Sequence, residues 1–489
     1  MHTTAFTGIA VAASLLAGTA AHHQGADPDT HARIDDYLQA RLEATDVPGA
    51  SWAVVTPDEI EHVVAWGEDG DGEPVTESTP FLWGSVAKPV TATAVMTLVE
   101  DGAIDLDEPV TAYLPGFRLA DEDHSDRITV RHLLQQTGGI PEGTGITDRF
   151  EDRADPYGDA VADLAGVRPL AGPGEAFGYA SANYLVLGAV VESASGMPYA
   201  EYLREAVLDP LDMDGAVATR EDAAAVPDGH SYAFGRPVGI DVSFDQTGPS
   251  YGYLGGSVTD LAHFGMAQLG EGVFGETRVL EPSSVAETHT GAAPMNETVS
   301  YGLGWRVDDR NADLGTSTVW HTGAAPGYLA GVILLPEIDR AVVMVQNLYG
   351  FFQDGALVGA MLNAARVLAG GEAAVPASDP TYPAILAVLL ALLSAAALVL
   401  VWTLRRIRRG GWRSAPRRRV AAGMACWTIG GLAVAYAAGV AVPGLFPNRS
   451  LLVLLLPDMG WSLYALALAA LLVAAVRLWA GFRRLAASR

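Results

Sequence analysis

Apolar runs divide the chain into a mixed-pattern N-terminal part and a strongly apolar C-terminal part. Three long apolar runs lie at about 383–403, 420–442 and 461–480, and none of them contains an acidic residue. Each approaches the roughly 20 residues that a helix needs to cross a bilayer. A buried soluble helix is the ordinary alternative. Three successive runs of this length instead favour three transmembrane helices, with membrane lipid as their partner.

Shorter apolar runs near both ends of the first part predict the strands of one sheet. A helix over about 351–368 closes the domain, and mostly helical patterns fill the stretch between the strand clusters. This order predicts an α/β domain of the α+β type over 27–369, in which helices flank an antiparallel sheet and a helical subdomain is inserted. The expected strands are 50–55, 62–66, 318–321, 328–335 and 340–346.

Two further segments flank this domain. Residues 370–382 are rich in Gly, Ala and Pro and are expected to form the linker to the membrane region. Residues 1–21 contain a short apolar run that ends in small side chains, which is typical of a secretory signal peptide. No Lys or Arg precedes that run, so the usual basic start is missing.

Charge is distributed unevenly between the two parts. From Thr381 onward there are 13 Arg and one acidic residue, whereas the whole chain has 30 Lys+Arg and 57 Asp+Glu. The first part is therefore strongly acidic, which excludes nucleic acid as a partner because phosphate would be repelled. Arginines concentrate at 405–419 and 483–489. Basic loops stay in the cytoplasm, so we expect a multi-pass cell-membrane protein whose acidic domain is extracytoplasmic.

Cysteine and metal-ligand patterns exclude some classes of site. Cys426 is the only cysteine, so no intrachain disulfide can form. The acidic residues are scattered, and neither a metal-ligand cluster nor a phosphate-binding glycine loop is visible. We therefore expect no metal and no cofactor.

The strongest chemical signal is Ser85-Val86-Ala87-Lys88 at the start of an apolar stretch that predicts a buried helix. Ser85 and Lys88 are three residues apart and share one face of that helix. A serine hydroxyl becomes a good nucleophile when a neighbour takes its proton. Lys88 is the only lysine in the chain. Arginine cannot release a proton in its place, so the survival of this lysine favours a catalytic role over a solvent-exposed one.

From these residues onward, over about 34–368, the chain resembles the class C β-lactamase and low-molecular-weight penicillin-binding-protein superfamily of serine hydrolases. The segment 81–89 is similar to its first motif. In the second motif, Tyr-x-Asn, Tyr179 matches the tyrosine, and the resemblance implies a proton relay beside Lys88. Ser181 stands where the family has Asn. Asn183 has the wrong spacing to replace it.

The third motif of the family is Lys-Thr-Gly or His-x-Gly on an edge strand, and the segment after Trp320 resembles the His form. The resemblance implies that the backbone N–H groups of Ser85 and Ala324 form an oxyanion hole. The substrate-binding residues it implies are Ser181, His321, Thr322, Gly323 and Ala324.

Together these features predict a membrane-tethered serine hydrolase that acts through an acyl-enzyme on a small-molecule or peptide substrate. Peptides, amides and esters all stay open, including cell-wall-derived D-alanyl peptides and β-lactams. Two alternatives remain. One is a penicillin-binding sensor or cell-wall binding protein with little turnover. The other is a nucleophile elbow at Ser250 in Gly-x-Ser-x-Gly, although its surroundings read as a loop.

Overall fold

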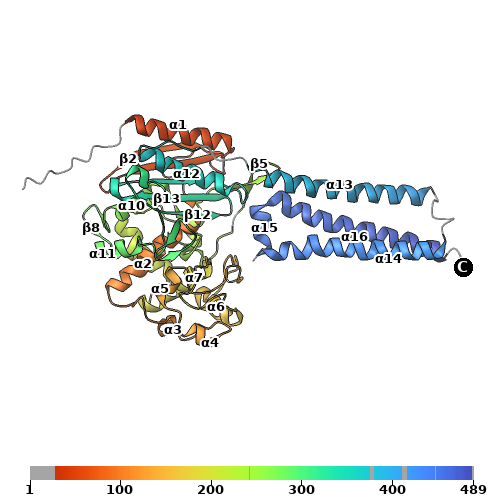
Figure 1. Ribbon diagram of the computed structural model, residues 1–489, viewed down its shortest axis with the longest axis horizontal. Coiled ribbons are helices and arrows are strands. Elements are labelled where there is room, and N and C mark those ends of the chain that lie inside the picture. Colours follow the sequence, from red (N-terminus) through yellow and green to blue (C-terminus); the bar gives the residue numbers. More distant parts are fainter. Residues whose placement is uncertain (1–27, 242, 375–378, 410–415, 447, 487–489) are drawn as a thin grey trace, which may run out of the picture.

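The computed structural model describes residues 28–489 except 242, 375–378, 410–415, 447 and 487–489. The proposed signal peptide therefore lies outside the described residues, as does part of the proposed linker. The described residues form a mixed α/β domain followed by a bundle of long helices (Figure 1).

An eight-stranded sheet lies at the centre of the domain, with strand order β2-β1-β14-β13-β12-β11-β10-β9 and antiparallel pairing throughout. Strands from both ends of the domain lie side by side in it, as the apolar pattern predicts. The strands are Gly49–Val55 (β1), Ile60–Gly67 (β2), Ala293–Pro294 (β9), Val299–Tyr301 (β10), Arg306–Asp308 (β11), Thr318–Ala325 (β12), Tyr328–Leu335 (β13) and Arg340–Gln346 (β14).

Helices cover both faces of the sheet because successive side chains of a strand point to opposite faces. In β14, Val342 packs in the core formed with α1 (Pro28–Ala44) and α12 (Asp354–Leu368). Its neighbour Val343 packs in the opposite core, with α10 (Val258–Leu269). The closing helix α12, expected from about residue 351, begins at Asp354.

A helical subdomain is inserted after the first two strands and lies beside the sheet (Figure 1). Its central helix, α2, packs against α7, and all but a few α2 side chains are buried. The helices are Ala87–Glu100 (α2), Val110–Tyr113 (α3), Glu122–Ser125 (α4), Val130–Leu134 (α5), Pro156–Ala162 (α6), Ser181–Ser195 (α7), Tyr199–Leu203 (α8) and Arg220–Ala223 (α9).

The expectation of mostly helical structure between the strand clusters misses several short strands. They include the pair β3 (Phe81–Leu82) and β6 (Gly255–Gly256), and the hairpin of β4 (Gly229–Ala233) and β5 (Arg236–Ile240). Elements of two to five residues are too short to show a clear alternating pattern. The remaining short elements are Val273–Phe274 (β7), Thr277–Arg278 (β8), Leu348–Tyr349 (β15) and Pro282–Thr288 (α11).

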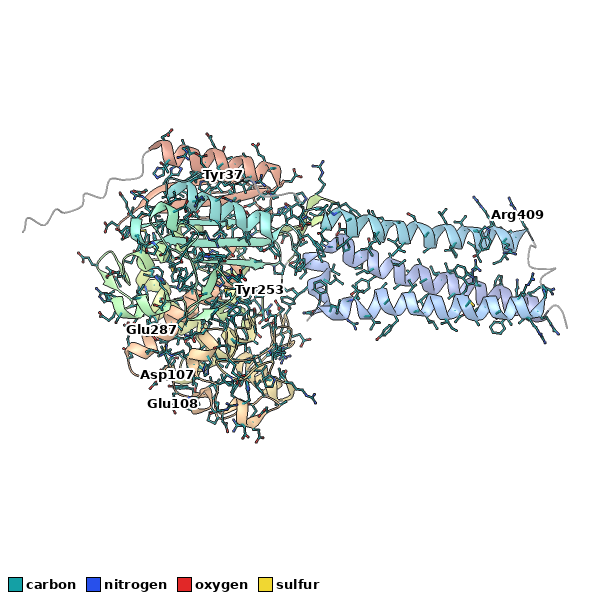
Figure 2. The ribbon with its side chains drawn as sticks, viewed as in Figure 1. Tyr37, Asp107, Glu108, Tyr253, Glu287 and Arg409 are labelled. Carbon is teal, nitrogen blue, oxygen red and sulfur yellow. The ribbon has the colours of Figure 1, made fainter. Side chains whose placement is uncertain are left out.

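Three C-terminal helices are long and apolar enough to cross a membrane. They are α13 (Thr381–Arg408), a helix over Arg417–Leu445 that begins with α14 (Arg417–Tyr436), and α16 (Pro457–Ala486). The short α15 (Arg449–Leu455) precedes the last of them. The bundle projects from one side of the domain, and Arg409 lies at its far end (Figure 2). Each helix extends beyond the expected apolar run. The C-terminal ends of α13 and α16 and the N-terminal end of α14 continue into arginines, which are good helix formers.

Candidate active site

Ser85 lies at the junction of a short strand and the central helix. It is the middle residue of a single 3₁₀ turn, η1 (Gly84–Val86), that leads directly into α2. The preceding residue, Trp83, donates its backbone N–H to Leu254 O at 2.8 Å and its indole N–H to Gly256 O at 3.1 Å. These two bonds hold the turn, so that Ser85 is partly exposed while both of its neighbours are buried.

Lys88 is completely buried and points at the serine. Its Nζ lies 2.9 Å from Ser85 Oγ, 2.8 Å from Tyr251 O and 3.4 Å from Ser181 Oγ. A neutral amine in this position can donate to Tyr251 O and Ser181 Oγ and keep its lone pair for the Ser85 hydroxyl. A fully buried lysine needs such partners. The distance to Ser85 Oγ is short enough for direct proton transfer between the two side chains.

Tyr179 and Ser181 reach the site from the segment that leads into α7 and from its first residue. The Tyr179 ring lies 4.9 Å from Lys88 Nζ, measured to the ring centroid. Ser181 is the first residue of α7, and its N–H donates to Glu142 Oε2 at 2.8 Å. The structure thus brings Ser85, Lys88, Tyr179 and Ser181 together, although the second pair lies far along the chain from the first.

The strand β12 closes the other side of the site. It pairs with β11 only from Thr318 to Trp320, and beyond Trp320 it packs against the turn that carries Ser85. Gly323 permits this approach, because a Cβ atom there would lie 2.3 Å from Ser85 N. Gly84 makes the matching approach, since its Cβ would lie 2.5 Å from Ala324 N, and its φ of +55° also favours glycine.

These two glycines set the backbone N–H groups of Ser85 and Ala324 close to each other. Ala324 is exposed in a strand whose other residues are buried. Two adjacent backbone donors beside a serine hydroxyl can stabilise the negative oxygen of a tetrahedral intermediate.

His321 is held inside the protein and not at the solvent edge of the site. Its Nδ1 lies 2.8 Å from Thr322 O, which can only accept, so Nδ1 carries the proton. Its Nε2 therefore accepts from Tyr301 Oη at 3.1 Å. Burial, with the nearby Arg306 and Lys88, holds the pKa of His321 well below its usual value. The imidazole is thus neutral, and both of its nitrogens are engaged within the protein.

A protein family model for "Beta-lactamase" matches residues 34–364. The chain belongs to this family. Within it, the chain is 30% identical over 334 residues to "Penicillin-binding protein 4" of Amycolatopsis lactamdurans, which covers 65% of this chain and 86% of that protein.

Two solved structures show the same fold as this beta-lactamase family member. A D-stereospecific amidohydrolase from Streptomyces sp. superposes with a TM-score of 0.53 at 24% identity, over 65% of this chain and 94% of that one. EstCE1, described as a hydrolase with promiscuous acyltransferase activity, gives a TM-score of 0.59 at 21% identity, over 69% of this chain and 98% of that one.

Arg306 is a site residue that the sequence alone does not reveal. Its Nη1 donates to Thr322 Oγ1 at 3.2 Å, and its guanidinium lies 5.7 Å from the Tyr179 ring centroid. Its buried Nε has no hydrogen-bond partner in the structure. Arg306 lies far from Tyr179 in the sequence, and no spacing rule links the two residues.

The competing candidates are placed differently. Ser250 is fully buried, and its hydroxyl donates to Thr247 O at 2.9 Å. Asn183 is also fully buried and donates to Gln136 Oε1. Neither side chain is available to a substrate, which agrees with interpreting Ser250 as part of a loop.

Among the residues that the structure describes, no three His, Cys, Asp or Glu side chains are grouped so as to hold a metal ion. The arrangement around Ser85 is one of nucleophile, buried amine, phenol and paired backbone donors. Such a set of groups performs acyl transfer.

Proposed function

We propose that this beta-lactamase-family hydrolase is tethered to the cell membrane, faces the outside, and cleaves a peptide, amide or ester through an acyl-enzyme on Ser85. The observation that carries the proposal is the 2.9 Å distance between Lys88 Nζ and Ser85 Oγ, at a place where the backbones of Ser85 and Ala324 approach closely. The related penicillin-binding protein, amidohydrolase and acyl-transferring hydrolase support acyl transfer as the reaction type.

In the first half of the reaction, Lys88 Nζ takes the proton of Ser85 Oγ as the oxygen bonds to the substrate carbonyl carbon. The carbonyl oxygen gains the negative charge and accepts hydrogen bonds from the N–H groups of Ser85 and Ala324. Tyr179, beside Lys88, passes the proton to the leaving amine or alcohol, and the carbon–leaving-group bond breaks.

In the second half, water attacks the acyl carbon and gives a proton to the same relay. The bond to Ser85 Oγ then breaks, the serine regains its proton, and the carboxylic acid product leaves. Ser181 contacts Lys88 at 3.4 Å, so it keeps a polar group where the family has an amide.

The surroundings of Thr322 favour a substrate that carries a carboxylate. Arg306 donates to the Thr322 hydroxyl, and its buried Nε–H is unsatisfied. A guanidinium and a hydroxyl together are the donors that recognise a carboxylate. His321 supports this pair by accepting from Tyr301 and donating to Thr322 O, which fixes the strand that presents them.

The arginines of the helix bundle support the outward orientation. The last turn of α13 carries Arg405, Arg406 and Arg408, and the last turn of α16 carries Arg483 and Arg484. Arg417, which opens α14, donates to Leu485 O near the end of α16. The basic residues thus gather at the end of the bundle away from the domain (Figure 1), and basic ends stay in the cytoplasm.

The test uses the full chain in detergent micelles, as wild type and as Ser85→Ala, with three probes. These are a fluorescent penicillin, a nitrophenyl ester and an N-acylated D-alanyl-D-alanine peptide. We expect wild type to form a covalent adduct or release product with at least one probe, and Ser85→Ala to do neither. Absence of both with wild type would contradict the proposal. A penicillin adduct that persists for many minutes without product would instead favour the sensor alternative.

A further inference from the structure

The tip of the β4–β5 hairpin breaks two ordinary rules of protein structure. Its two turn residues, Phe234 and Gly235, have φ angles of +53° and +76°. A hairpin turn of this kind favours Asn or Asp at the first position, because a bulky side chain is strained at positive φ. Phe234 is also 61% exposed. A residue with a strained backbone and an exposed apolar side chain is a candidate for a functional position.

The same hairpin tip is hydrogen-bonded to the N-terminal ends of two of the long helices, α13 and α16. Phe234 N donates to Asp458 Oδ2 at 2.8 Å, and Asp458 is the second residue of α16. Gly235 N donates to Tyr382 Oη at 3.0 Å, and Tyr382 is the second residue of α13. Tyr382 in turn donates to Asp458 Oδ2 at 2.6 Å. The hairpin backbone is therefore bonded where the two helices begin.

A second exposed aromatic ring lies beside the first of these helices. Phe351 is 50% exposed and packs edge-on against Phe352 at 5.4 Å between centroids. Phe352 lies 6.0 Å from the Tyr382 ring. Among the described residues of the hydrolase domain, the only large apolar side chains that are strongly exposed are Leu170, Phe234 and Phe351. Two of the three thus gather where the helices leave the domain.

A third helix end carries the same kind of side chain. Leu445 is 80% exposed and ends the short turn Pro443–Leu445 that follows α14. Phe234 thus lies by the starts of α13 and α16, Phe351 lies near the start of α13 through Phe352, and Leu445 follows α14. In the proposed tether these helix ends lie at the membrane interface, where Phe, Trp and Leu side chains bury themselves among the lipids.

We propose that Phe234 and Phe351 insert into the outer interface of the bilayer, so that the hydrolase domain is seated directly on the membrane in one orientation. This inference rests on the proposed membrane tether. The occupant of the apolar patch formed by Phe234 and Phe351 is lipid, because the patch adjoins the ends of helices that lipid surrounds in the proposed tether. This insertion also explains the strained turn, which exposes an aromatic ring instead of packing it in the core.

The single cysteine of the chain makes a direct test possible. In a Cys426→Ala background, nitroxide labels are attached to Phe234→Cys and, separately, to Phe351→Cys, in the full chain in nanodiscs. Collision rates with oxygen, which concentrates in lipid, and with a water-soluble nickel chelate then report the surroundings of each label. The water control is Leu170→Cys, which replaces an equally apolar side chain that is 74% exposed. The lipid control is Leu398→Cys, at a side chain 69% exposed on α13.

We expect the oxygen-to-nickel collision ratio at positions 234 and 351 to exceed that at 170 several-fold, and to lie below that at 398. Equal ratios at 234, 351 and 170, with a lipid-like ratio at 398, would overturn the seating while the tether stands. A water-like ratio at 398 would overturn the tether and the seating together. Spin–spin broadening between copies at 234, with low rates for both reagents, would show that a second copy covers the patch and would also overturn the seating.

Discussion

Two apolar helices of this protein look alike in composition and have opposite surroundings. In α2, 11 of the 14 residues are buried, and among them are Lys88, Thr91 and Thr93. In α13, only Tyr382, Leu386 and Thr403 of 28 residues are buried. An apolar helix must avoid water either inside protein or inside lipid. The domain encloses α2, and in the proposed tether a bilayer would surround α13.

The comparison also explains where polar groups are tolerated. Lys88 is buried in α2 because three oxygens surround its Nζ. The basic residues of α13 lie in its last turn. In the proposed tether they would lie in water beyond the bilayer, so α2 places its polar amine among hydrogen-bond partners, whereas α13 places its charges at one end.

The largest expected effect tests Lys88, the buried amine of α2. Lys88→Arg keeps a positive charge but removes the group that can release a proton, so kcat/KM should fall by at least about 10³-fold. Hydrolysis of the nitrophenyl ester by the purified full chain measures this. Ser85→Ala should lose activity to a similar extent without lowering the melting temperature. Retention of most of the activity by Lys88→Arg would contradict the proposed proton transfer.

The second effect tests the lipid environment of α13. Leu398→Arg replaces a side chain that is 69% exposed, so it would cost little if water surrounded the helix. In a bilayer, a charge at the middle of a span raises the apparent free energy of insertion by about 3 kcal/mol. Insertion of the first span into microsomes measures it, with Leu398→Ile as the matched control. An unchanged insertion efficiency would contradict the membrane assignment.

The third effect concerns Arg306, whose Nη1 donates to Thr322 and whose Nε has no hydrogen-bond partner in the structure. Arg306→Ala should raise KM about 10- to 100-fold for substrates with a free carboxylate, because a charge-assisted hydrogen bond is lost. Esters without a carboxylate should be affected much less. Arg310→Ala is the matched control. Arg306 and Arg310 both lie over the Trp320 ring, at 4.9 and 4.7 Å, but Arg310 pairs with Asp308. An equal effect on both substrate classes would make the role of Arg306 structural.

The smallest effect concerns Asp148, near the side of the domain that meets the helix bundle. Asn448, between the second and third spans, donates to Asp148 O at 3.0 Å. Burial raises the pKa of the Asp148 carboxyl from 3.8 to about 6. The folded chain therefore binds this proton more tightly than the unfolded chain, so the carboxyl stabilises less as pH rises from about 4 to 6.

Asp148→Asn should remove this pH dependence. Relative to wild type, the variant should gain about 1–2 kcal/mol of unfolding free energy between pH 4.5 and 7.5, because part of the titration lies below pH 4.5. Melting temperatures of both full chains at the two pH values measure the change. A constant difference between them would show that the carboxyl does not titrate in this range.

Much of the fold follows from local patterns. The five long strands and the three apolar helices have enough residues for their periodicity to be visible, and the fold and family agree with the resemblance drawn from the motifs. The short strands β3, β6 and β9 have two residues each, so no pattern reveals them. Yet β3 and β6 hold the turn that carries Ser85, so an element invisible in the sequence positions the nucleophile.

The sequence by itself predicted the pairing of Ser85 with Lys88, because two residues three positions apart are a local relation, and the structure places their side chains 2.9 Å apart. It also predicted the three long apolar helices, because their length and composition are visible in the sequence. Only the tertiary structure decided that Tyr251 O accepts a hydrogen bond from Lys88 and that Arg306 lies beside Tyr179. It also decided that Phe234 lies at the start of α16. Those contacts join residues far apart in the chain. Their partners are selected by the packing of the whole fold, which no local pattern records.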